Sequence, residues 1–78
     1  MLAVLKKELI DFLGDNIKKY GILELVRLDG KSGPVVETED GFDVNLGKMK
    51  KGFLYYLEGV GEVKGFYKYK GSLKIYDF

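Results

Sequence analysis

Residues 9–28 read LIDFLGDNIKKYGILELVRL, and the spacing of apolar residues changes within this stretch. Up to Tyr20, apolar residues recur every three or four positions, which is the period of one face of an α-helix. After Gly21 the period becomes two, which is typical of a β-strand. Gly21 also suits the left-handed backbone conformation in which many helices end. The stretch therefore predicts a helix that is followed by strands.

The helical spacing continues toward the N-terminus, so we predict one amphipathic helix over residues 2–20. Lys18 and Lys19 fall in its last turn, where positive charge suits the negative end of the helix dipole. Gly14 is the weak position, because glycine costs roughly 1 kcal/mol relative to alanine in a helix interior. The sequence leaves open whether the helix breaks there into two shorter helices.

The rest of the chain consists of short segments that are rich in β-branched and aromatic residues and are bounded by glycines. Asp40-Gly41 fits a two-residue type I′ hairpin turn. Residues 47–58 are ambiguous between helix and strand, and we favour a strand. A helix followed by strands indicates an α+β fold, with the helix packed on a mostly antiparallel sheet of four to six strands. The predicted strands cover residues 22–28, 35–39, 42–46, 53–58, 62–69 and 73–78.

The composition describes a small soluble domain. The chain has 78 residues, which fits a single domain over residues 1–78, and 46% of them are apolar. The longest apolar runs, Met1–Leu5 and Phe53–Leu57, are far shorter than the ~20 residues of a membrane span. We expect a cytoplasmic protein without a leader or a membrane contact. Abundant Lys and Glu with few thermolabile side chains are typical of heat-adapted proteins.

Catalysis is not expected, because the chain lacks histidine and cysteine, the commonest general base and the best nucleophile. The same absence excludes a disulfide and a Cys/His zinc site. The carboxylates Glu37, Glu39, Asp40 and Asp43 are crowded, but they lack the alternating spacing of a calcium loop. Charges beside a hairpin turn usually form a solvated edge. We predict no catalytic residues, metal, cofactor or small-molecule substrate.

Charge and aromatic residues are unevenly distributed along the chain. Residues 1–46 hold six Lys or Arg and nine Asp or Glu, whereas residues 47–78 hold seven and three. Eight of the eleven aromatic residues also lie in the second part. If Lys70–Ser72 form a three-residue loop, one face of the C-terminal hairpin carries aromatic rings among lysines. The predicted face consists of Lys64, Phe66, Lys68, Lys74, Tyr76 and Phe78.

Such a face suits two kinds of partner. Aromatic rings that a small domain cannot bury are typical anchors for another protein, including a second copy of the chain. Rings among lysines also suit the bases and phosphates of RNA or single-stranded DNA. The sequence pI of 7.9 and the single arginine, Arg27, disfavour the second partner. We therefore predict a non-enzymatic protein-binding accessory or regulatory module, with self-association included. The alternative is weak, sequence-tolerant binding of RNA or single-stranded DNA by the same face.

Overall fold

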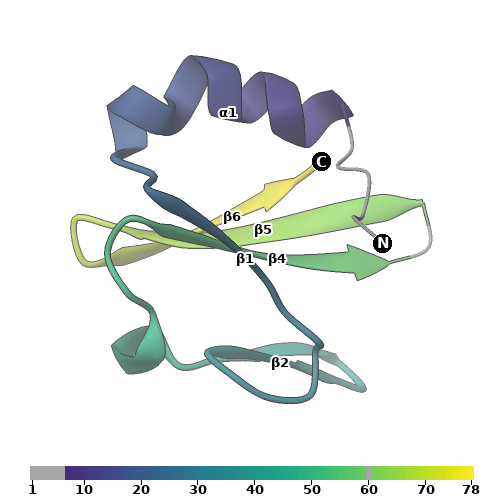
Figure 1. Cartoon of the computed structure of the whole chain (residues 1–78). Coiled ribbons are helices and arrows are strands. Elements are labelled where there is room, and N and C mark those ends of the chain that lie inside the picture. Colours follow the sequence, from purple (N-terminus) through teal and green to yellow (C-terminus); the bar gives the residue numbers. More distant parts are fainter. Residues whose placement is uncertain (1–6, 60) are drawn as a thin grey trace.

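The computed structural model describes residues 7–59 and 61–78, and it stacks a helix, a central sheet and a hairpin in that order (Figure 1). The helix α1 (Lys7–Tyr20) covers one face of the central sheet, and the hairpin covers the other. The central sheet contains β1 (Glu24–Arg27), β4 (Phe53–Gly59), β5 (Glu62–Tyr69) and β6 (Ser72–Asp77). The hairpin contains β2 (Val35–Thr38) and β3 (Gly41–Val44), and the 3-10 turn η1 (Leu46–Lys48) follows it. Within the described ranges, no helix is long and apolar enough to cross a membrane.

The structure confirms the α+β class and corrects the sheet in one respect. The strand order is β1-β4-β5-β6, and β1 runs parallel to β4 while the other neighbours are antiparallel. Parallel neighbours need a crossover connection, and here the chain makes the β2–β3 hairpin on the far face before it returns as β4. The six strands are therefore divided into a mixed sheet of four and a separate pair.

The helix continues without a break through Gly14 and ends at Tyr20. Gly21 adopts φ 65°, and the Ile22 N–H donates to the Ile17 carbonyl at 2.9 Å. This bond reaches five residues back along the chain. Together with the left-handed glycine, it forms the Schellman motif that ends many helices. Residues 2–6 of the predicted helix lie outside the described residues.

The predicted type I′ turn at Asp40-Gly41 is wrong. Thr38 pairs with Gly41, so that Glu39 and Asp40 form the turn. Type I′ needs positive φ at both central residues, but Lys70 is the one non-glycine with positive φ in the described part of the chain. Gly41 adopts φ 146° directly after the turn, so the conformational freedom of glycine is used beside the turn and not within it.

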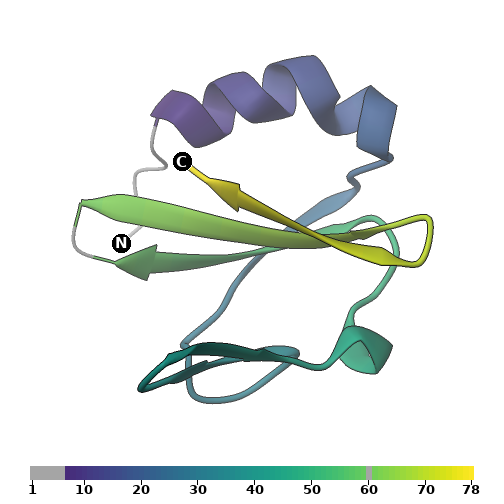
Figure 2. The same cartoon turned by 180° about the vertical axis from the view of Figure 1, so that it is seen from behind.

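The core consists of two clusters, one on each face of the central sheet, between the layers that Figure 2 shows from behind. Side chains alternate along β4, because Leu54 and Tyr56 join one cluster while Tyr55 and Leu57 join the other. This arrangement resolves the ambiguous stretch in favour of a strand from Phe53. The helix-side cluster consists of Leu9, Phe12, Ile22, Leu54, Tyr56, Val63 and Tyr67. The hairpin-side cluster consists of Val35, Met49, Tyr55, Leu57 and Phe66.

Two glycines allow a matched test of the helix. An alanine Cβ would meet nothing within 4 Å at either Gly14 or Gly21, but only Gly21 has a positive φ. We expect Gly14→Ala to raise the free energy of unfolding by about 1 kcal/mol, because alanine favours a helix interior. Gly21→Ala should lower it by roughly 1 kcal/mol, because a Cβ is strained in the left-handed region. Urea denaturation followed by circular dichroism measures both, and the same sign for both variants would contradict the continuous helix and its cap.

Candidate functional site

The turn between β5 and β6 decides where the predicted contact residues lie. Lys70 and Gly71 form a two-residue turn with φ values of 52° and 79°, and Tyr69 pairs with Ser72. Positive φ at both central residues is the type I′ geometry. The predicted three-residue loop is therefore wrong, and the register of β6 moves by one residue. A one-residue shift turns every side chain of a strand to the other face.

The six predicted contact residues consequently do not share one face. Lys64, Phe66 and Lys68 point toward the hairpin, because Phe66 belongs to the hairpin-side cluster. Lys74 lies opposite Tyr67, which belongs to the helix-side cluster. Antiparallel partners share a face, so Lys74, Tyr76 and Phe78 lie on the helix side.

The hairpin and η1 contact the first three of these residues. Phe66 is completely buried, and its ring centroid lies 5.3 Å from that of Phe42. Lys64 places its Nζ 5.2 Å from the centroid of the Phe42 ring. Lys68 donates from Nζ to the Leu46 carbonyl at 3.4 Å. Phe66 is a core residue in this structure; of the two lysines beside it, Lys64 contacts the hairpin and Lys68 contacts η1.

The helix partly covers two of the other three residues. The ring centroids of Tyr76 and Phe78 lie 4.6 and 5.2 Å from that of Phe12 on α1. Tyr76 nevertheless stays 37% exposed, and Lys74 is exposed beside it. The structure thus brings Lys74, Tyr76 and Phe78 together along β6, at the margin of the helix.

A group of tyrosines lies next to this margin. The Tyr67 ring packs 5.1 Å from Tyr20 and 6.1 Å from Tyr76, measured between centroids. Burial raises the pKa of the Tyr67 hydroxyl well above its usual range, and a hydrogen bond with Tyr20 adds to the effect. A hydrogen bond between Tyr20 and Tyr76 lowers the pKa of Tyr20 and raises the pKa of Tyr76. The three hydroxyls are therefore close enough to influence one another's ionisation.

The raised pKa of Tyr67 predicts a loss of stability in alkali. The unfolded chain releases this proton near the usual tyrosine pKa of 10.0, whereas the native state keeps it. The native state then binds more protons above that pH, so the free energy of unfolding must fall as pH rises. We expect a decline that begins near pH 10 and is weaker in Tyr67→Phe. Urea denaturation at several pH values measures it, and equal slopes for the two proteins would contradict the buried hydroxyl.

The burial of Phe66 has its own test. We expect Phe66→Ala to lower the free energy of unfolding by about 3–5 kcal/mol, because it leaves a cavity between the sheet and the hairpin. Ile75, the residue paired with Phe66 across the two strands, is 51% exposed. Ile75→Ala should therefore change stability by less than about 1 kcal/mol. Similar losses for the two variants, measured by urea denaturation, would contradict the burial of Phe66 and the exposure of Ile75.

The outer edge of β6 is open in the part of the chain that the structure describes. β6 is the last strand of the sheet and pairs with β5 alone. Val63 and Phe78 exchange two backbone hydrogen bonds, of 3.4 and 2.8 Å. Because such pairs alternate along an antiparallel ladder, the N–H and C=O groups of Leu73, Ile75 and Asp77 point away from β5. These backbone groups line a free edge.

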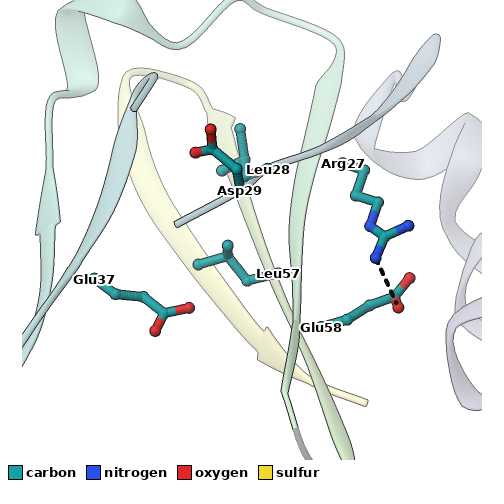
Figure 3. Close-up of a pocket in the computed structure, with 6 residues that line it drawn as sticks. All are labelled: Arg27, Leu28, Asp29, Glu37, Leu57 and Glu58. Atoms are coloured by element: carbon teal, nitrogen blue, oxygen red, sulfur yellow. Dashed lines mark ion pairs between the residues drawn. The ribbon is translucent and has the colours of Figure 1, made fainter. Parts of the chain in front are cut away.

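A separate hollow of about 370 Å³ lies near the ends of β1 and β4 (Figure 3). It contains an ion pair between Arg27 Nη2 and Glu58 Oε2, at 3.5 Å. Asp29, which also lines the hollow, accepts the backbone N–H groups of Lys31 and Ser32 at 2.8 and 2.9 Å. These bonds hold the pKa of Asp29 below its usual range. Two of the carboxylates around the hollow are thus used within the chain.

The crowded carboxylates of the sequence do not gather at this hollow. Glu37 lines it, whereas Asp43 lies on the opposite face of the hairpin because it pairs with Val36, the neighbour of Glu37. Among residues 7–59 and 61–78, no group of three or more Asp, Glu, His or Cys side chains could hold a metal ion. Neither the sequence cluster nor the hollow therefore supplies a multidentate site.

Comparison of the chain with protein-family models, with curated proteins and with solved structures found no match.

Proposed function

We propose that this chain is a small protein-binding accessory module and that the edge of β6 is its contact element. The preferred partner is a second copy of the chain. The observation that carries the proposal is the open edge itself, with the outward backbone groups of Leu73, Ile75 and Asp77. An added strand satisfies such groups in pairs.

The edge of β6 has neither a bulge nor a proline, two of the devices that prevent strand addition. β6 pairs with β5 over six consecutive positions without a bulge, and it contains no proline. Natural edges are commonly protected by bulges, prolines or charges. Here the centre of the edge is Ile75, which is 51% exposed, and its neighbour Tyr76 is 37% exposed. These apolar side chains give a partner strand surface to cover.

Two-fold symmetry selects one register for a second copy. When a two-fold axis relates two antiparallel strands, the residue on the axis pairs with its own copy. Ile75 is the middle one of the three residues whose backbone groups point away from β5. Placing Ile75 opposite Ile75 of the second copy brings Leu73 opposite Asp77. Each of these pairs can exchange two backbone hydrogen bonds. On the helix side, the same register sets Lys74 against the ring of Tyr76, a cation–π pairing.

The order of charges also favours the antiparallel arrangement. Lys74 lies near the start of β6 and Asp77 at its end. Antiparallel pairing brings the basic start of one strand beside the acidic end of the other. A parallel arrangement in register would set like charges side by side, which destabilises strand pairs. The charges therefore favour the antiparallel direction of pairing.

Self-association can be tested with two exposed isoleucines. We expect the wild-type chain to sediment as a dimer at high micromolar concentration, and Ile75→Lys to sediment as a monomer because two like charges would face each other. Ile10 on α1 is 52% exposed and provides the matched control, so Ile10→Lys should remain dimeric. A wild-type monomer throughout the concentration range, or dissociation of both variants, would overturn the proposal.

The alternative function is binding of RNA or single-stranded DNA by the same six residues. It required one continuous surface, but the six residues occupy two faces of the sheet. The rings of Phe66 and Tyr76, for example, lie on opposite sides of the sheet. A surface that suits phosphate lies elsewhere in the molecule, at a cleft lined by five lysines.

A further inference from the structure

Three segments meet at one end of the molecule and enclose a cleft of about 340 Å³. They are the C-terminal end of α1, the loop between η1 and β4, and the turn between β5 and β6, which lie at the same end in both views (Figures 1 and 2). Five lysines line the cleft, namely Lys18, Lys19, Lys51, Lys68 and Lys70.

The charge of these lysines is not balanced within the described chain. No described carboxylate lines the cleft. The cations of the described ion pairs are Lys7, Arg27 and Lys64, all outside this group. The C-terminus of α1 contributes the equivalent of roughly half a negative charge, far less than five ammonium groups carry. The cleft is therefore a cationic site that favours a multiply charged anion.

Two tyrosine rings stand among the lysines. Tyr20 and Tyr69 meet edge to face, with their centroids 5.1 Å apart, and both are partly exposed. The Nζ atoms of Lys19 and Lys70 lie 5.2 and 5.3 Å from the Tyr20 and Tyr69 centroids, respectively. The site thus combines positive charge with aromatic surface.

We infer that this cleft binds single-stranded nucleic acid, with the lysines on successive phosphates and the tyrosine rings against unpaired bases. The ammonium groups come from three separate segments, so a chain of phosphates can meet more of them than a single phosphate can. No arginine lines the cleft in the described residues. Lysine acts as a point charge without the bidentate fork that reads guanine. Binding is therefore independent of sequence, and the bases must be unpaired to reach the rings.

The charge part of the inference is tested with a labelled oligothymidylate in fluorescence anisotropy titrations at several salt concentrations. Each phosphate neutralised in a single strand contributes about −0.7 to the slope of log K against log salt. We expect a wild-type slope of about −3 and a slope about 1.4 less steep for Lys19→Gln/Lys70→Asn. Asparagine is chosen at position 70 because it tolerates the φ of 52° there.

The matched control removes the same charge elsewhere. Lys7, which pairs with Asp11 at 2.8 Å, and Lys31, in the loop after β1, lie outside the cleft. Lys7→Gln/Lys31→Asn should retain the wild-type slope and affinity. Equal losses for the two double variants would overturn the cleft as the site, and so would an absence of wild-type binding at low salt.

The ring part is tested at Tyr69 with the same probe. Tyr69→Leu removes the aromatic surface and should weaken binding at least about fivefold, whereas Tyr69→Phe should bind like the wild type. Inorganic polyphosphate with the same number of phosphates supplies the charge without bases. It should bind more weakly and should not distinguish Tyr69→Leu from the wild type. Equal affinity for polyphosphate, or equal binding by Tyr69→Leu and Tyr69→Phe, would overturn nucleic acid as the ligand.

Discussion

The structure depends on the burial of β4 and β5 on both faces. Tyr55 and Leu57 contact the hairpin side while Leu54 and Tyr56 contact the helix side, so this segment supplies apolar side chains at consecutive positions. A chain of 78 residues can bury only a limited share of its surface. Its core therefore consists of two thin layers, one on each face of a single sheet. Both the helix and the hairpin are therefore needed to bury the apolar faces of the sheet.

This arrangement separates the interior of the sheet from its margins. The middle of β5 is buried, as Phe66 and Tyr67 show, and cannot serve as a docking face. β6 at the edge keeps Ile75 and Tyr76 exposed. Lysines in or beside the turns and loops at the ends of the sheet remain at least partly exposed. The two proposed contacts occupy an edge and an end of the sheet, which the helix and the hairpin do not cover.

Local patterns were sufficient for the elements but not for their pairing. The period change at Gly21 marks the end of the helix, and alternation marks the strands, because both signals depend on near neighbours. The predicted contact face was wrong because the loop before β6 is one residue shorter than predicted. Ser72 suits a loop by its type, whereas the structure places Lys70 in the left-handed region and Ser72 in the strand. A lysine with positive φ leaves no mark in the sequence.

The sequence by itself determined the class of the protein: one helix, then strands, without the side chains for disulfide or zinc chemistry. Only the tertiary structure decided that β1 lies beside β4, that Phe66 is buried, and that Lys18 and Lys19 join lysines from distant segments. The reason is physical. Periodicity reports which side of an element is apolar, but the identity of the covering element depends on long-range packing, which no local pattern encodes.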